Sequence, residues 1–214
     1  DPAPKGRGRT RMPPMVPGLV ADMKRYLAQR RLDYGVATHN GWYPSNKAGD
    51  DLPRIVIPGT MGSGPTFVVT PGGVSHHMGS RGPFWQARTL VGGEPRYQSP
   101  GGERNGAVIV VRSYQTPTEA VLVEGPMDAL VAAMYGKLGV AVMGNTPGEA
   151  TLGAVVRSIT PVNRVLLVPD LDAPGAFTEA LGKLSAWGMR CRLVIPPAKD
   201  LAACRDDQRK DVLR

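Results

Sequence analysis

Residues 120–134 read AVLVEGPMDALVAAM, an apolar run that ends at Glu124 and continues into a helical pattern. The apolar run Ala120–Val123 has the length and composition of a buried strand. Gly125 and Pro126 suit a tight turn and the first position of a helix. The stretch therefore predicts a strand, an acid at its carboxyl end, and a helix that begins beside the acid.

Two further segments place acids after apolar runs. Residues 164–175 read RVLLVPDLDAPG, so Asp170 and Asp172 follow the second run, and residues 191–195 precede Lys199 and Asp200. Because parallel strands end at the same edge of a sheet, we expect these distant acids to gather there. Crowded carboxylates repel one another unless a divalent cation is present, and Mg²⁺ prefers oxygen ligands. The pattern predicts a magnesium site at this edge.

Each acid also has a structural interpretation. Asp172 could cap the helix that follows it, and Asp128 could favour the dipole of its helix. Capping alone does not require two acids at the end of one apolar strand, so we interpret Asp170 and Asp172 as metal ligands. Glu124 has no basic neighbour in sequence and is interpreted as a functional acid. For Asp128 both interpretations stay open.

Composition limits the class of protein. A chain of 214 residues with 42% hydrophobic residues can bury a substantial core. No apolar run has the length of a membrane span and the first residues lack a secretory signal, so we expect a cytoplasmic location. Two cysteines are too few for a disulfide scaffold or a four-cysteine zinc site.

The charge is strongly basic and unevenly distributed. The net charge is +8, and residues 1–31 contain eight Lys or Arg against two Asp. Such charge attracts nucleic acid phosphates without regard to base sequence. Residues 1–16, rich in Pro, Gly and Arg, predict a flexible basic arm, for which a merely solubilising tail is the alternative.

The rest of the chain changes character near residue 107. Residues 18–31 have a helical pattern, and residues 40–106 are rich in Gly, Pro and short β-like runs. From Ala107 onward strands and helices alternate, which indicates a parallel sheet covered by helices. The predicted fold class is therefore α/β.

Taken together, the motifs resemble a known domain. Glu-Gly after a strand, Asp-x-Asp after a second strand, and a later Lys-Asp are similar to the Toprim domain of topoisomerases, primases and some nucleases. Within that superfamily the DnaG-type primases of bacteria and phages are most similar. Upstream, residues 53–58, 84–88 and 95–100 resemble the basic segments that precede the Toprim domain in those primases. The resemblance implies a basic mixed α+β subdomain over residues 17–113 and a Toprim catalytic domain over residues 114–214.

The resemblance also implies an activity. It is the synthesis of short RNA primers from ribonucleoside triphosphates on a single-stranded DNA template, with Mg²⁺ or Mn²⁺ as cofactor and a replicative helicase as a further partner. Glu124, Asp170 and Asp172 would be the catalytic acids, and Asp200 would join them as a metal ligand. The expected nucleic acid and nucleotide contacts are Arg54, Arg88, Arg96, Tyr97, Gln98 and Lys199.

One position departs from the family pattern. Primases of this type usually have a second acid two residues after the Lys-Asp acid, where this chain has Ala202. Either fewer ligands hold the metals, or Asp206 or Asp207 compensates. The related primases usually also have a separate zinc-binding domain, for which this sequence has too few cysteines. A Toprim nuclease or topoisomerase fragment and a non-catalytic single-strand-binding module remain as alternatives.

Overall fold

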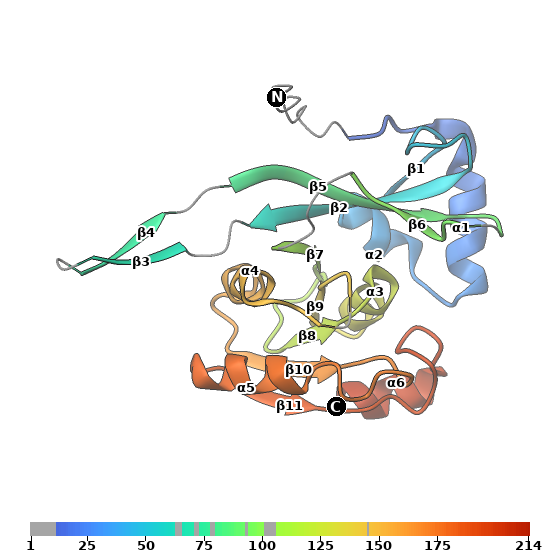
Figure 1. Cartoon of the computed structure of the whole chain (residues 1–214). Helices are drawn as coiled ribbons and strands as arrows, with labels where there is room; N and C mark the ends of the chain where they lie inside the picture. Colours follow the sequence, from blue (N-terminus) through green and yellow to red (C-terminus); the bar gives the residue numbers. More distant parts are fainter. Residues whose placement is uncertain are drawn as a thin grey trace, which may run out of the picture.

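The computed structural model describes residues 12–62, 66–70, 73–77, 80–92, 94–100, 106–144 and 146–214 (Figure 1). The strands are β1 (Tyr43–Ser45), β2 (Arg54–Gly62), β3 (Thr66–Thr70), β4 (Gly73–His77), β5 (Ser80–Thr89), β6 (Tyr97–Gln98), β7 (Ala107–Val111), β8 (Ala120–Val123), β9 (Leu138–Ala141), β10 (Arg164–Val168) and β11 (Arg190–Leu193). The helices are the 3-10 turn η1 (Pro17–Leu19), α1 (Val20–Gln29), α2 (Tyr34–His39), α3 (Pro126–Met134), α4 (Glu149–Ile159), α5 (Thr178–Ala186) and α6 (Asp206–Leu213).

One mixed sheet forms the centre of the molecule. Its strand order is β11-β10-β8-β9-β7-β2-β5-β6, and β1 pairs with β2. Strands β8, β9, β10 and β11 run parallel, as expected from the alternation of strands and helices. From β7 onward the pairing is antiparallel. The sheet is therefore continuous across the expected subdomain boundary near residue 113, and that boundary stays a prediction.

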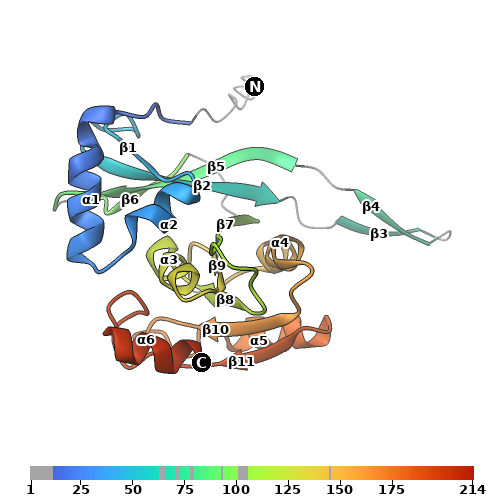
Figure 2. The same ribbon diagram turned by 180° about the vertical axis from the view of Figure 1, so that it is seen from behind.

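Helices cover both faces of the parallel strands because side chains alternate along each strand. In β8, Val121 and Val123 pack in a core with residues of α1, α2, α3 and α6. Ala120 and Leu122 face the other way and pack with residues of α4 and α5. Both views show helices on either side of these strands and the β3–β4 hairpin extending away from them (Figures 1 and 2). The result is a layered α/β fold.

Helix α3 approaches β9 very closely. A Cβ atom added at Gly139 in β9 would lie 2.0 Å from the carbonyl oxygen of Ala129 in α3. Only a glycine permits this contact, because any side chain would overlap the helix backbone. The glycine therefore fixes how α3, and the acids at its start, sit against the sheet.

Only the end of the expected flexible arm, residues 12–16, lies among the described residues. Residues 1–11 of that arm lie outside the described residues. Beyond them, the Tyr43 hydroxyl donates to the Pro13 carbonyl at 2.7 Å, and the Val16 amide donates to the Pro44 carbonyl at 2.9 Å. Residues 12–16 therefore lie along β1 instead of extending into solvent. Among the described residues, no helix is both long and apolar enough to cross a membrane.

Candidate active site

The parallel strands reverse their order at β8. The chain passes from β8 through α3 to β9 on one side, and then through α4 to β10 on the other side. Open α/β sheets bind ligands beyond the carboxyl ends of the strands at such a reversal point. Glu124 directly follows β8, and Asp170 stands two residues after β10. The acids that the sequence marks therefore lie where this topology places a ligand.

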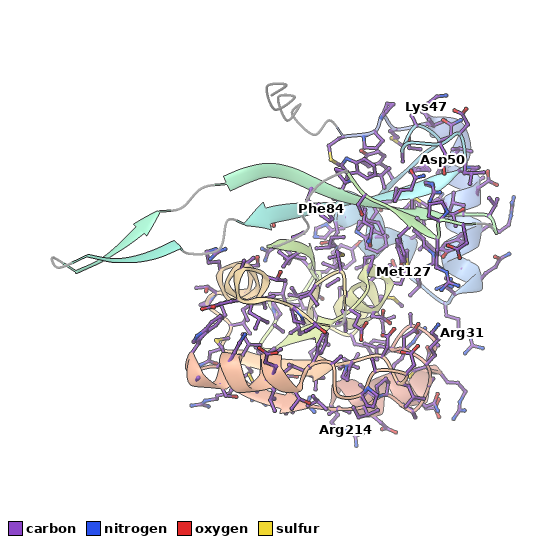
Figure 3. The ribbon with its side chains drawn as sticks, in the orientation of Figure 1. Arg31, Lys47, Asp50, Phe84, Met127 and Arg214 are labelled. Atoms are coloured by element: carbon purple, nitrogen blue, oxygen red, sulfur yellow. The ribbon has the colours of Figure 1, made fainter. Side chains whose placement is uncertain are left out.

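A cavity of about 330 Å³, here called the acidic cavity, lies at this position. It brings together carboxylates from three segments, the β8–α3 junction and the loops after β10 and β11, and Arg88 and Arg96 face it from the β5–β6 side. Met127, labelled in Figure 3, belongs to the first turn of α3 in its lining. The lining includes the acids Glu124, Asp128, Asp170 and Asp200, the cations Arg30, Arg88, Arg96 and Lys199, and Gln86, Tyr97, Met127 and Met143.

Backbone amides hold one oxygen of several of these carboxylates. The Asp170 amide donates to Oε1 of Glu124 at 3.2 Å, and the Ala202 amide donates to Oδ1 of Asp128 at 2.7 Å. Asp200 accepts the amide three residues further along the chain at 2.6 Å. These bonds fix the orientation of Glu124, Asp128 and Asp200. The arrangement suits a cluster that receives a cation from outside.

Crowding and burial disfavour charge on these acids. Burial raises the pKa of Asp128 to about 8, and the nearby Asp200 carboxylate adds to the increase. Burial also raises the pKa of Asp170 to about 6, with Glu124 as the largest charged contributor. The pKa of Glu124 is raised by burial, with a further contribution from Asp172. A divalent cation would reverse this balance by stabilising the ionised forms.

The donor set fits Mg²⁺ or Mn²⁺ by its chemistry, because it offers carboxylate oxygens alone. Within the described part of the chain, no three His, Cys, Asp or Glu side chains already converge on one metal position. Asp172 is exposed and does not line the cavity, although its charge acts on Glu124 and Asp170. The structure thus gathers Glu124, Asp170 and Asp200 but leaves Asp172 outside the cavity, and an ion would have to draw the gathered carboxylates together.

Of the four cations that line the cavity, Arg88 is buried, whereas Arg30, Arg96 and Lys199 are exposed. Arg88 is 8% exposed. Its Nε donates to the Tyr26 hydroxyl at 2.9 Å, and its guanidinium lies 4.7 Å from the centre of the Tyr97 ring. Arg96 and Lys199 line the same cavity and are exposed. Arg88 is therefore held in place, whereas Arg96 and Lys199 can follow a bound phosphate.

Two expected contacts lie elsewhere. The Arg54 side chain is 0% exposed and pairs with Asp50 at 2.6 Å. It also donates to the Pro95 carbonyl at 3.1 Å. Gln98 donates to the same Asp50 carboxylate at 2.9 Å. Neither residue lines the acidic cavity. The expectation that Arg54 contacts phosphate is wrong, because its guanidinium is enclosed and already bonded within the protein.

The acids proposed to compensate for Ala202 do not reach the cavity. Asp207 pairs with Arg205 at 3.0 Å, and Asp206 is exposed on the same helix. Neither lines the acidic cavity. Asp128 instead bonds the backbone of Ala202, the position where the family pattern has its second acid. We therefore count Asp128 with the acids of the site.

Two lining residues with polar or charged side chains, Gln86 and Arg30, were not predicted from the sequence. Gln86 is 5% exposed and stands two residues before Arg88 in β5, so it faces the same side of the strand. Its Oε1 is buried without a hydrogen-bond partner among the described residues. The alternation of residues 84–88 could have identified it. Arg30, at the end of α1, reaches the cavity only through tertiary packing.

Solved structures share this fold, although no family model and no curated relative matches the chain. The primase fragment of the bacteriophage T7 primase-helicase protein superposes with a TM-score of 0.58 at 15% identity, covering 88% of this chain and 72% of that chain. The chain has the fold of DnaG-type primase catalytic domains.

Two further structures agree with this fold. The DnaG primase catalytic domain bound to ssDNA gives a TM-score of 0.58 at 15% identity over 91% of this chain and 74% of that chain. The Aquifex aeolicus primase, with its zinc binding and RNA polymerase domains, gives 0.55 at 16% identity over 83% of this chain and 50% of that chain. The expected α/β architecture is confirmed by these neighbours, and the roles of the site residues stay proposals.

Proposed function

We propose that this chain is the catalytic core of a DNA primase, which joins ribonucleotides on a single-stranded DNA template. One observation carries the proposal. Acids from the ends of β8 and β10, the start of α3 and the loop after β11 face arginines from the β5–β6 side across one cavity. Such a site can hold a metal-bound triphosphate and contact a polyanionic strand at the same time. The primase fold supports this combination.

The acids of the cavity would bind the metal ions that the reaction requires. Glu124, Asp128, Asp170 and Asp200 would hold Mg²⁺ or Mn²⁺, with Asp172 adding negative charge beside them. A bound divalent ion stabilises charge on the attacking and leaving oxygens of a phosphoryl transfer. In the joining step a 3′-oxygen forms a bond to the α-phosphorus of the incoming nucleotide, and diphosphate leaves. The proton of the 3′-hydroxyl passes to a base.

Glu124 is the candidate for that base or for a metal ligand. Its raised pKa suits a proton acceptor, because catalytic bases work best with a pKa near the working pH. Glu124→Gln distinguishes the roles. Loss of a base removes the pH dependence of the joining rate at saturating metal. Loss of a ligand raises the metal concentration needed for half-maximal rate.

The cations of the cavity would bind the phosphates of the substrates. Arg96 and Lys199, both exposed at the cavity, would contact phosphates of the nucleotide or template. Arg88 and Tyr97 form a stacked pair whose positive charge faces the cavity. The T7 neighbour is described as a primase-helicase protein, and on that ground we also propose a replicative helicase as a partner.

The test is primer synthesis. The chain is incubated with single-stranded DNA, labelled ribonucleoside triphosphates and Mg²⁺ or Mn²⁺, and the products are sized. We expect short RNA products that disappear in Asp170→Asn and persist in Asp207→Asn, an exposed acid outside the cavity. Cleaved DNA in place of RNA products would support the nuclease alternative. DNA binding with neither product would support a non-catalytic binding module.

A further inference from the structure

Strand β11 lies at one end of the large sheet and leaves one edge open. It pairs with β10 alone among the described strands, and the Arg190 amide donates to the Asn163 carbonyl at 2.8 Å. Because backbone groups alternate in direction along a strand, the amides and carbonyls of Cys191 and Leu193 point away from β10. Both views show β11 at the lower end of the sheet (Figures 1 and 2). This edge can therefore pair with one further strand.

The side chains of β11 divide between two faces of the sheet. Cys191 and Leu193 point to one face and pack with the core beside α4 and α5. Arg190 and Arg192 point to the other face, because successive side chains alternate. Arg190 is exposed and forms no ion pair among the described residues, and Arg192 is half-buried. A strand added to β11 would place its own side chains beside these two sets in alternation.

The arginine face has an excess of positive charge. Arg164 in β10 is the Cα partner of Arg190, and both are exposed. Like charges directly opposite one another in neighbouring strands repel. The carboxylate of Glu119, directly before β8, is shared between Lys137 at 2.8 Å and Arg192 at 3.3 Å. Negative charge placed beside β11 would therefore relieve the repulsion on this face.

Large apolar side chains are exposed on either side of β11 in the sequence. Trp187, at the end of α5, is 41% exposed, and Ile195, two residues after the strand, is 38% exposed. Charged side chains on an edge strand usually discourage pairing with other chains. Apolar groups at both ends of the strand do the opposite, because a partner would remove them from water. The combination favours a partner that is both acidic and apolar.

We propose that β11 binds an extended acidic segment of a protein partner, which adds to the sheet as a further strand. In this binding mode main-chain hydrogen bonds supply affinity, and alternate side chains supply specificity. The acidic side chains of the segment lie beside Arg190 and Arg192, and its apolar side chains lie on the side of α5. The recognised sequence therefore alternates acidic and apolar residues. This site is separate from the acidic cavity, so the inference does not depend on the proposed function.

The test uses three labelled peptides of about six residues, a usual strand length. One alternates aspartate and valine, the second has the same residues in two blocks, and the third alternates lysine and valine. Fluorescence anisotropy gives their dissociation constants for the wild-type chain. We expect the alternating acidic peptide to bind most tightly. Methylation of alternate backbone amides in that peptide should abolish binding for the set that faces β11 and leave it unchanged for the other set.

Arg190→Glu reverses the charge of the edge at an exposed position. We expect the dissociation constant of the acidic peptide to rise about tenfold, equivalent to about 1.4 kcal/mol, and the lysine peptide to gain affinity. Primer synthesis should not change, because Arg190 does not line the acidic cavity. Arg112→Glu is the matched control. Arg112 is exposed after β7, and β9, β8 and β10 separate β7 from β11, so this variant should bind the peptides like the wild type.

Amide hydrogen exchange of the wild-type chain locates the peptide without any substitution. The Cys191 and Leu193 amides should exchange more slowly when the acidic peptide is bound, and unchanged exchange at both would overturn the inference. Equal binding of the block peptide would also overturn it, because it would show attraction to charge alone.

Two outcomes would assign the edge to another occupant and overturn the inference. One is weaker binding of a single-stranded oligonucleotide in Arg190→Glu together with no binding of the acidic peptide, which would indicate a nucleic acid surface. The other is slower exchange of the Cys191 and Leu193 amides at higher protein concentration without peptide, which would indicate a second copy of this chain.

Discussion

Replacing Asp128 with asparagine should stabilise the metal-free protein. Asp128 is 7% exposed, and its Oδ1 accepts the Ala202 amide at 2.7 Å. Burial, with Asp200 nearby, raises its pKa to about 8. In an unfolded chain the same group has a pKa of about 3.9. Asparagine keeps an oxygen for the Ala202 amide and carries no charge. It therefore avoids the free-energy cost of a buried carboxyl group beside Asp200.

The sign and size follow from proton linkage. Between these two pKa values the native state binds a proton that the unfolded state has lost, so the free energy of unfolding falls as pH rises. The interval from the unfolded pKa of about 3.9 up to pH 7 corresponds to roughly 4 kcal/mol of unfolding free energy, at about 1.36 kcal/mol per pH unit. Because Asp128 shares the cavity with Asp170 and Asp200, we attribute about half of this free energy, about 2 kcal/mol, to Asp128 alone. For a chain of this size that is roughly 4–8 °C in Tm.

The assay is thermal unfolding in a chelator at pH 5, 7 and 8. We expect the Tm of Asp128→Asn to exceed that of the wild type at pH 7, and the difference to narrow at pH 5. Asp207→Asn is the control, because Asp207 is exposed and Arg205 holds its pKa below the ordinary value. Its Tm should stay near or slightly below that of the wild type.

Two results would refute the reasoning. One is a Tm of Asp128→Asn at or below that of the wild type at pH 7. The other is a dependence of Tm on pH that is the same in both proteins, since the proton bound by Asp128 would then contribute nothing. The same variant should lose primer synthesis despite its higher Tm, because acids at functional sites are retained at the expense of stability.

Three further substitutions test other parts of the structure. Asp170→Asn should reduce nucleotide joining by about 100-fold or more while the Tm is retained, and a wild-type yield of sized products at limiting Mg²⁺ would contradict the metal assignment. Arg54→Ala should lower the free energy of unfolding by about 3 kcal/mol in urea titrations, because it leaves Asp50 unpaired. Reduced DNA affinity at unchanged stability would contradict the structural role of Arg54. Gly139→Ala should destabilise the fold by about 1–3 kcal/mol, because its Cβ would overlap the Ala129 carbonyl, and an unchanged urea midpoint would exclude that close packing.

Local pattern predicted most of the parallel half of the fold. The runs before Glu124 and Asp170 form β8 and β10, and Gly125 and Pro126 stand at the N-cap and the first position of α3, as expected. These features depend on neighbours in sequence, through hydrophobic periodicity and turn geometry, and so they are visible without a structure. The basic arm stays a prediction, and residues 12–16 at its end pack along β1 through contacts that no local pattern encodes.

Sequence pattern was enough to place acids at the carboxyl ends of strands, since the strand, the acid and the following helix are contiguous. Tertiary structure alone decided which side chains meet. Arg54 and Arg88 are both single arginines in β-like runs, yet one is enclosed against Asp50 and the other lines the acidic cavity. Arg30 lines the acidic cavity from the end of α1, and Arg209 of α6 bonds the carbonyl of Ala202 in its lining. The reason is physical: the partner of a charged side chain depends on how segments far apart in the sequence pack together. Their spacing in the sequence does not show which of them will meet.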